Sequence, residues 1–223
     1  MKIKYFILSA AAMLCGTANA QFMQSGTTRK VEYGSNNPGR KYSSGWNSFY
    51  FQYNYTDAGD NVFDNYNGVS FEYNRTIGLS PNVPLYLQIG AGWRYSISTT
   101  DDYYYDYTSN LVTFTLPVSV LYHFYIPNSS IGFELYTGIN MKAHVYNDLK
   151  YDSDYRDDTK TITKDLNNPN VGWHVGGNVN FGRFFLGIRY GEDFIKMYKY
   201  TTDGYGKDRA KTLTVGLGFR FGE

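Results

Sequence analysis

The sequence predicts an all-β fold, and more specifically an eight-stranded antiparallel up-and-down transmembrane β-barrel. Two observations carry this prediction: eight segments alternate between apolar residues and small or polar residues, and the connections between them are alternately short and long. A period of two is typical of strands, because successive side chains point to opposite faces of a sheet. An even number of strands lets the last strand pair with the first, and a membrane requires such a closed sheet because lipid cannot satisfy open edges.

The composition excludes several other classes of protein. A length of 223 residues allows one domain of ordinary size or two small ones. The 21 Lys and Arg residues nearly balance the 20 Asp and Glu residues, whereas a nucleic-acid-binding domain would be clearly basic. A mean hydropathy of -0.45, without an apolar run of about 18 residues in the body of the chain, argues against a helical membrane protein. The chain is rich in Tyr, Phe and Gly, with 24, 15 and 23 residues, which favours a β-rich fold over disorder.

The first twenty residues are predicted to be a secretory signal peptide. Lys2 and Lys4 form a basic start, an apolar stretch follows from Phe6 to Gly16, and Ala18-Asn19-Ala20 forms a small-x-small end. This order of features is typical of a cleaved export signal, with cleavage before Gln21. The protein is therefore expected to leave the cytoplasm.

The exported chain is predicted to lack cysteine and to begin with a polar segment. Cys15 lies within the predicted signal, and Leu14 before it argues against a lipoprotein signal, which has a small residue there. The exported chain then has no cysteine and no disulfide. Residues 21–45 are polar and rich in Gly, Ser and Asn, without periodicity, and are predicted to form a flexible periplasmic arm.

Periodicity begins at Trp46, and residues 46–221 are predicted to form the barrel. The predicted strands are Trp46–Thr56, Asn67–Leu79, Pro84–Ser98, Thr108–Tyr125, Ile131–Tyr146, Asn170–Phe181, Arg183–Phe194 and Lys211–Phe221. Each has one apolar face, which carries, in chain order, Phe49, Phe51, Tyr53 and Tyr55; Val69, Phe71, Tyr73 and Ile77; Leu85, Leu87, Ile89 and Trp93; Val112, Phe114, Leu116 and Val118; Ile131, Phe133, Leu135 and Ile139; Val171, Trp173, Val175 and Val179; Phe184, Leu186, Ile188 and Tyr190; Leu213, Val215, Leu217 and Phe219.

The connections support an up-and-down order of the strands. Residues 80–83, 127–130 and the turn around Gly182 are short, whereas the remaining connections are long and rich in Asp, Tyr, Thr and Lys. The long connections lie near residues 57–66, 99–110, 147–168 and 195–210. All long loops are thus expected at one end of the barrel and all tight turns at the other. Strands of ten or more residues, tilted by about 45°, are long enough to cross a membrane.

The apolar face is predicted to point outward into lipid. A soluble sandwich or a lipocalin-like barrel also alternates, but with its apolar face inward. The apolar face is assigned Trp46, Trp93 and Trp173, whereas Gly, Asn, Gln, Ser and Thr gather on the other face. An eight-stranded barrel has room inside only for side chains, and so many large aromatics would overfill it. The polar face also carries the charges Glu72, Arg94, Glu134, Lys142, Arg189 and Arg220, for which a structural salt-bridge network is expected.

Aromatic residues gather toward both ends of the predicted strands, as in the interfacial girdles of membrane barrels. Tyr55, Trp93, Tyr95 and Trp173 lie toward the long loops, and Tyr122, Phe124, Phe181, Phe219 and Phe221 toward the turns. One charge breaks the pattern: Arg75 has the lipid-facing parity. A charge at mid-membrane costs about 2–4 kcal/mol, falling toward zero near the interface. A bulge near Asn74, snorkelling toward the turn side, or a docked partner protein would each explain it.

With these features the chain resembles the small eight-stranded outer-membrane barrels of the OmpX and OmpA transmembrane-domain type. The signal ending Ala18-Asn19-Ala20 before Gln21, the Tyr- and Asn-rich strands and the closing Gly-Leu-Gly-Phe-Arg-Phe at residues 216–221 are similar to the outer-membrane β-barrel domain family of Bacteroidota. The resemblance covers roughly residues 46–221 and rests on pattern rather than on a diagnostic motif. It implies that Phe221 serves as the signal read by the barrel-assembly machinery, although Gly222 and Glu223 follow it.

No catalytic, cofactor-binding or metal-ligating residue is predicted, because no nucleotide loop, zinc-protease helix or nucleophile elbow occurs. His144 and His174 are expected on adjacent strands, inside the barrel near the long-loop rim. They could form a two-histidine metal site, but no third ligand is evident and lumen hydrogen bonding is the simpler interpretation. The loop Asp152–Asp158 has carboxylates at alternating spacing, as calcium loops do, yet it lacks the Gly and Glu of an EF-hand. A solvated loop is therefore expected, and a weak, exposed cation site is the alternative.

The sequence therefore predicts a non-enzymatic protein of the cell outer membrane with a filled, non-conducting lumen, and it needs no cofactor. Two roles remain open: a structural, adhesion or surface-interaction protein, and an accessory barrel subunit of a secretion, assembly or uptake complex. The expected partners are outer-membrane lipid, the barrel-assembly machinery, and an envelope or host surface protein, with no nucleic acid. The exposed loops favour the first role, and Arg75 with the arm 21–45 favours the second.

Overall fold

The structure is a computed structural model that describes residues 42–58, 65–101, 106–126, 129–152, 158–161, 166–198 and 209–222. The predicted signal peptide and the predicted arm up to residue 41 lie outside these residues. Among the described residues there is no helix long and apolar enough to cross a membrane.

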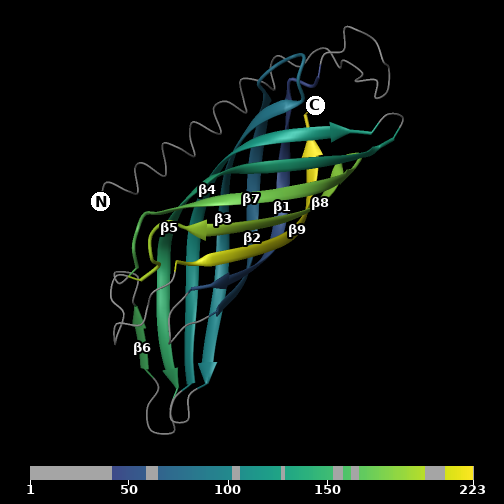
Figure 1. Cartoon of the computed structure of the whole chain (residues 1–223). Helices are drawn as coiled ribbons and strands as arrows, with labels where there is room; N and C mark the ends of the chain where they lie inside the picture. The colour runs from purple at the N-terminus through teal and green to yellow at the C-terminus, as the bar shows by residue number, and fades with distance from the viewer. Residues whose placement is uncertain are drawn as a thin grey trace. The chain divides into compact units, whose positions relative to one another are not determined.

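The described chain forms a closed antiparallel barrel (Figure 1). Its strands are β1 (Gly45–Asp57), β2 (Asn65–Gly78), β3 (Leu85–Asp101), β4 (Asp106–Tyr125), β5 (Ile131–Asp152), β7 (Asn170–Phe181), β8 (Phe184–Asp193) and β9 (Lys211–Phe221). Each strand pairs with its neighbour in the chain, apart from the short β6 described below, and β1 pairs with β9 to close the ring. The predicted fold class, an eight-stranded up-and-down barrel, is confirmed.

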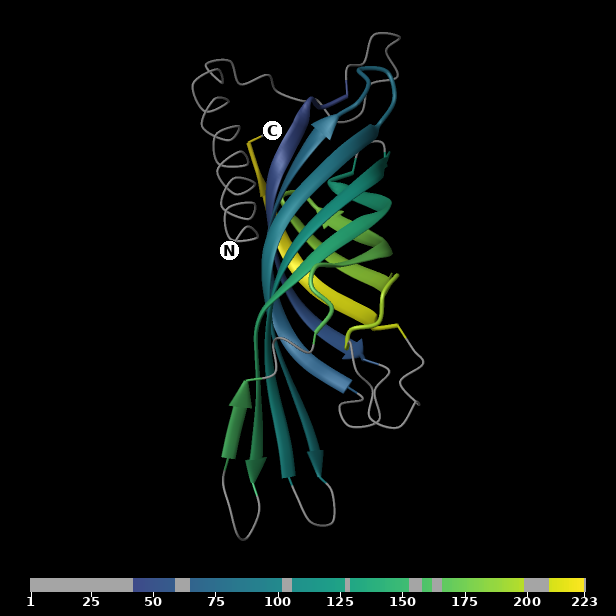
Figure 2. The ribbon, with the colours of Figure 1, turned by 90° about the vertical axis from the view of Figure 1, so that its left-hand side faces the viewer.

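A ninth short strand and three long strands extend the sheet beyond the barrel (Figure 2). The pairing of β2 with β3 ends at Asn67 and Ile97, but β3 and β4 remain paired as far as Asp101 and Asp106. Strand β6 (Asp158–Thr161) pairs only with the far end of β5. The predicted strands are therefore too short at this end: β3 continues past Ser98 to Asp101, β4 begins at Asp106 rather than Thr108, and β5 continues past Tyr146 to Asp152. The added segments consist mostly of polar residues, such as Thr99, Thr100, Ser109 and Asn110, so the alternation that marks the barrel strands fades there.

The exterior of the barrel is apolar, as predicted from the alternation. Phe51 is 58% exposed and Leu217 57% exposed, whereas Gln52 and Thr214 between such positions are buried inside. Along every strand of the barrel the exposed side chains are those of the apolar parity, including Val69, Phe71, Trp93, Val120, Phe133, Leu135, Ile139, Val175, Leu186, Ile188 and Val215. A closed sheet with this exterior satisfies its backbone internally and presents hydrocarbon to its surroundings, as a transmembrane barrel must.

Tyr–Asn hydrogen bonds lie on the outer surface toward both ends of the strands. The hydroxyls of Tyr53 and Tyr95 donate to Asn67 and Asn110 at 2.7 and 2.8 Å near the long-loop end. Tyr73 makes the same kind of bond to Asn47, at 2.8 Å, near the turn end. Tyrosine is suited to this position because its ring is apolar and its hydroxyl requires a polar partner. These pairs mark the two borders of the apolar belt.

Several large aromatic rings lie inside the barrel, which corrects the assignment of Trp46 to the outer face. Trp46 is 2% exposed and packs in the lumen against Tyr86, with ring centroids 4.7 Å apart. It shares the parity of the buried Ser48 and Tyr50, so the alternation itself places it inside. Tyr136 and Phe185 are also buried there.

The lumen accommodates these rings because glycines stand opposite them. A Cβ atom added to Gly218 would lie 2.1 Å from the ring of Phe185, and one added to Gly176 would lie 2.5 Å from the ring of Tyr136. The expectation that aromatic rings would overfill the lumen is therefore wrong where a glycine on a neighbouring strand provides the space.

Replacing Gly218 with alanine is expected to destabilise the barrel by about 1–3 kcal/mol, because the added methyl group overpacks the Phe185 ring. Urea unfolding in lipid vesicles would measure the change. Phe185→Leu in the Gly218→Ala background should recover part of the loss. A Gly218→Ala barrel as stable as the wild type would contradict this packing.

Candidate functional site: the polar lumen

The lumen holds most of the buried ionisable groups among the described residues, so it is the candidate site for any chemistry. At its centre, the guanidinium of Arg189 on β8 donates two hydrogen bonds to the carboxylate of Glu72 on β2, at 2.8 and 2.9 Å. The pair spans the barrel, since β2 and β8 are not neighbours. The Arg189 guanidinium also lies 5.5 Å from the ring centroid of Tyr136. Both charges are buried, so each depends on the other for compensation.

Glu134 on β5 collects several donors toward the turn end. It accepts hydrogen bonds from Nδ1 of His123 at 3.1 Å and from the amide of Asn178 at 2.7 Å, and it forms an ion pair with Arg220. Arg220 in turn lies 4.7 Å from the ring centroid of Trp46 and donates to Asn180 at 2.6 Å. This cluster joins β4, β5, β7 and β9 around one carboxylate. The cluster holds these four strands together through buried hydrogen bonds and an ion pair, and it presents no exposed reactive group.

Toward the long-loop end, Lys142 on β5 pairs with Asp193 at the end of β8, with Nζ and Oδ1 2.6 Å apart. The other oxygen of Asp193 accepts from the amide of Asn170 at 3.1 Å. Asp193 is not among the lumen charges predicted from the sequence. It continues the inward parity of Phe185 and Arg189, so the alternation alone would have identified it.

Arg94 on β3 differs from the other lumen cations. Its Nε is buried and has no hydrogen-bond partner, and within the described part of the chain no carboxylate forms an ion pair with it. The expected salt-bridge network therefore includes Glu72, Glu134, Lys142, Arg189 and Arg220, but not Arg94.

The structure places His144 and His174 inside the barrel on adjacent strands, but at different levels. His174 pairs with Gly138 on β5, six residues before His144, which corresponds to roughly 20 Å along the strand at about 3.3 Å per residue. Nε2 of His174 is hydrogen-bonded to the hydroxyl of Ser119 at 2.7 Å, across Gly138, which lies between them in the sheet and has no side chain. Nδ1 of His144 is hydrogen-bonded to the hydroxyl of Thr113 at 2.9 Å. The two rings do not share a site, and each has a hydroxyl partner of its own.

The described residues contain no group of three or more His, Cys, Asp or Glu side chains arranged to hold a metal ion. Residues 153–157 of the acidic loop lie outside the described residues, as do the side chains of Asp152 and Asp158.

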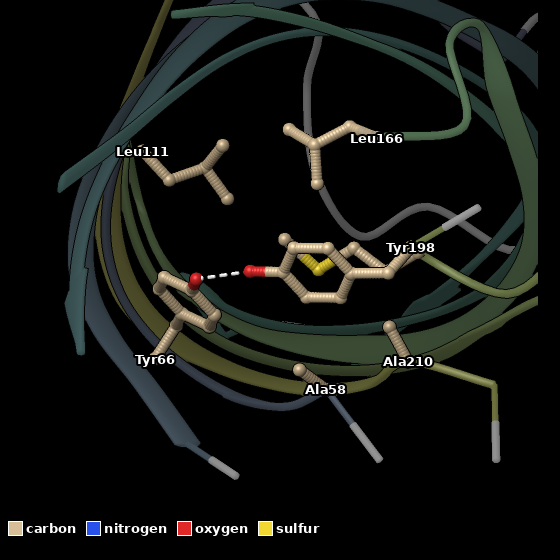
Figure 3. Packing of buried hydrophobic residues seen from close by; sticks show 7 residues of the cluster. Ala58, Tyr66, Leu111, Leu166, Tyr198 and Ala210 are labelled. Atoms are coloured by element: carbon tan, nitrogen blue, oxygen red, sulfur yellow. Dashed lines mark hydrogen bonds between the residues drawn. The ribbon is translucent and has the colours of Figure 1, made fainter. Parts of the chain in front are cut away.

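An apolar cluster lies at the long-loop end of the lumen (Figure 3). Leu166, Met197 and Tyr198 come from the connections after β6 and β8, and the side chains of Leu166 and Tyr198 point into the ring of strands. The hydroxyl of Tyr198 lies 2.5 Å from that of Tyr66 on β2, and the latter lies 3.0 Å from Ser109 on β4. The full cluster consists of Ala58, Tyr66, Leu111, Leu166, Met197, Tyr198 and Ala210. We call it the mouth cluster. The mouth cluster could not be predicted from the alternation, because its members lie toward the long-loop ends of strands and in connections without periodicity.

Arg75 lies on the outer face near the turn end, as its parity predicts. Its Nη1 donates to Oδ1 of Asn47 at 3.3 Å, and the same oxygen accepts from Tyr73. The register of β2 with both neighbours is continuous around Asn74, so the suggested bulge there is wrong. Arg75 therefore lies at the polar border of the apolar belt, where a charge costs little.

Comparison with known proteins yields structural likenesses only, since no family model and no curated protein matches the chain. Neisserial surface protein A (NspA) is 13% identical, with 80% of this chain and 98% of that one covered and a TM-score of 0.46. Ail of Yersinia pestis, in complex with a heparin analogue, is 12% identical, with 80% and 100% covered and a TM-score of 0.45. The outer-membrane enzyme PagL is 10% identical, with 77% and 98% covered and a TM-score of 0.36. The fold assignment rests on the strand pairing of this chain itself.

Proposed function

We propose that this protein is an integral outer-membrane barrel with a filled, non-conducting lumen and a structural, adhesion or surface-interaction role. The observation that carries the proposal is the combination of an apolar exterior with a lumen filled by paired charges and rings. Two cavities among the described lumen residues toward the long-loop end measure about 20 Å³ each. Such a volume holds one or two water molecules, not a passing solute.

The surface role is supported by the part of the sheet that continues beyond the barrel. Strands β3, β4 and β5 stay paired past the end of β2, and β6 adds a further strand there. This segment gives the long loops a hydrogen-bonded base, which suits display to a partner outside the membrane. We also propose that the predicted signal peptide exports the chain and that the chain is a member of the Bacteroidota barrel family. The barrel-assembly machinery would recognise Phe221, which faces outward and stacks on Phe49 with ring centroids 5.1 Å apart.

The outward polar group of Asn47, Tyr73 and Arg75 favours the second role, an accessory subunit of an outer-membrane complex. Purification in mild detergent followed by native mass spectrometry distinguishes the two roles. A single chain with bound lipid supports the surface role, whereas a stoichiometric second subunit that is lost in Arg75→Ala supports the accessory role.

Location in the membrane is tested by fractionation. The protein should be recovered with the outer membrane and migrate faster on gels before boiling than after, because the closed barrel resists detergent. Recovery in the soluble periplasmic fraction would contradict the proposal.

In planar bilayers the purified protein should produce no stable channels of porin size, because the paired charges and the mouth cluster fill the lumen. Single-channel recording checks this expectation. Large, regular openings would show that the lumen is a pathway, and the proposed role would then be wrong.

A further inference from the structure

The lumen carries more positive than negative charge toward its long-loop end. Among the described lumen residues, three carboxylates face four Lys and Arg side chains, and the three ion pairs leave Arg94 without a carboxylate of its own. The carboxylates are Glu72, Glu134 and Asp193, and the paired cations are Arg189, Arg220 and Lys142. A charge in a barrel interior is costly unless an opposite charge compensates it.

The register places Arg94 in one row with two other inward side chains. Arg94 on β3 pairs with Thr113 on β4, and Thr113 pairs with His144 on β5. Side chains directly opposite each other on neighbouring strands have Cβ atoms about 5 Å apart. All three line one cavity of about 20 Å³, together with Lys142 and Asp193, and Met197 of the mouth cluster borders it as well.

Two buried nitrogen atoms of this row have no hydrogen-bond partner. They are Nε of Arg94 and Nε2 of His144, and the His144 side chain is only 4% exposed. When the hydroxyl of Thr113 donates to Nδ1 of a neutral His144 ring, the hydrogen of that ring is on Nε2. When the ring is protonated, both nitrogen atoms carry a hydrogen, so Nε2 is a donor in either case. The cavity is then bordered by two N–H donors. Both oxygens of the nearby Asp193 are already bonded, to Lys142 and Asn170.

From this arrangement we propose that the lumen binds a small inorganic anion of halide size between Arg94 and His144, beneath the mouth cluster. The anion balances the charge of Arg94 and accepts hydrogen bonds from both unpartnered donors. The cavity volume matches a single halide or one to two water molecules and excludes phosphate, sulfate and sugar carboxylates. This inference does not depend on the proposed surface role.

The test measures urea unfolding midpoints of the full barrel in lipid vesicles, in chloride and in gluconate at equal ionic strength. Gluconate is too large for the cavity, so the wild type should have the higher midpoint in chloride, since a ligand that binds only the folded state stabilises it. Arg94→Met should lose this difference and unfold in gluconate no earlier than the wild type. Arg183→Met removes the same charge at the exposed turn between β7 and β8 and should retain the full difference.

An equal midpoint of the wild type in both salts, or an undiminished chloride effect in Arg94→Met, would overturn the proposal. If Arg94→Met does not fold, Thr113→Val takes its place, because it removes the hydroxyl that orients His144, and it should reduce the chloride effect. Anomalous scattering from crystals soaked in bromide locates the ion independently. A peak between Arg94 and His144 supports the site, whereas peaks only at the protein surface, or water density in the cavity, refute it.

Discussion

Replacing Glu72 with alanine is expected to lower the free energy of unfolding by about 3–5 kcal/mol, because Arg189 is then left buried without a countercharge. The two hydrogen bonds of 2.8 and 2.9 Å that join these side chains across the lumen are lost together. Urea unfolding in lipid vesicles, followed by tryptophan fluorescence, measures the effect. Glu72→Gln should also be strongly destabilising, since it keeps the shape but removes the charge.

The paired replacement Glu72→Met with Arg189→Met separates charge compensation from packing. Removing both charges leaves no uncompensated ion, so the double variant should be clearly more stable than either single variant. Arg183→Ala, which removes an exposed arginine of the turn before β8, should change stability by only about 0.5 kcal/mol or less. If Glu72→Ala behaves like Arg183→Ala, the inward orientation of this pair is wrong.

Glu134→Ala is expected to have an effect of the same size, about 3–5 kcal/mol, because it leaves Arg220 buried and uncompensated. It also removes the acceptor for His123 and Asn178, at 3.1 and 2.7 Å. Urea unfolding midpoints of Glu134→Ala and of a variant that loses only one neutral hydrogen bond would measure the contribution of the ion pair to stability.

In that series, Asn178→Ala removes one neutral donor and should cost about 1 kcal/mol, the usual net value of one hydrogen bond. Glu134→Ala should exceed it severalfold. Equal effects of the two variants would show that the ion pair with Arg220 contributes no more than a neutral bond, which is the opposite of what its burial implies.

The fold could be predicted from the sequence because one physical rule governs nearly all of it. In lipid, a strand must be apolar outside, and the narrow lumen must take small and polar groups. The alternation of Phe49, Phe51 and Tyr53 with Ser48, Gln52 and Asn54 follows directly from this rule. The same rule placed the charges of the Glu72–Arg189 pair inside, although it could not show which acid meets which base. Partners across the lumen come from strands that are not neighbours in the chain.

Trp46 was assigned to the outer face although its alternation with Ser48 and Tyr50 places it inside, where its ring packs on Tyr86 and its ring centroid lies 4.7 Å from Cζ of Arg220. The other features that were missed lie where the rule does not apply. In β5 the register with β4 shifts between Val112 and Thr113, so that Val145 and Tyr146 are both exposed and the parity changes beyond them. Strand β6 lies in a long connection, and the mouth cluster combines residues of the long connections with strand residues at the long-loop end, where lipid imposes no period.

The pairing of β1 with β9 has a consequence for how the barrel forms. Asn47 near the start of the described chain pairs with Phe221 near its end, so the edge of β1 stays open until the last strand has been delivered. Contacts between such distant residues form late, because the entropy of closing a long loop opposes them until many other contacts exist. Insertion into the bilayer should therefore be slow and cooperative. A chain that stops before Lys211 retains two unpaired edges, which lipid does not tolerate.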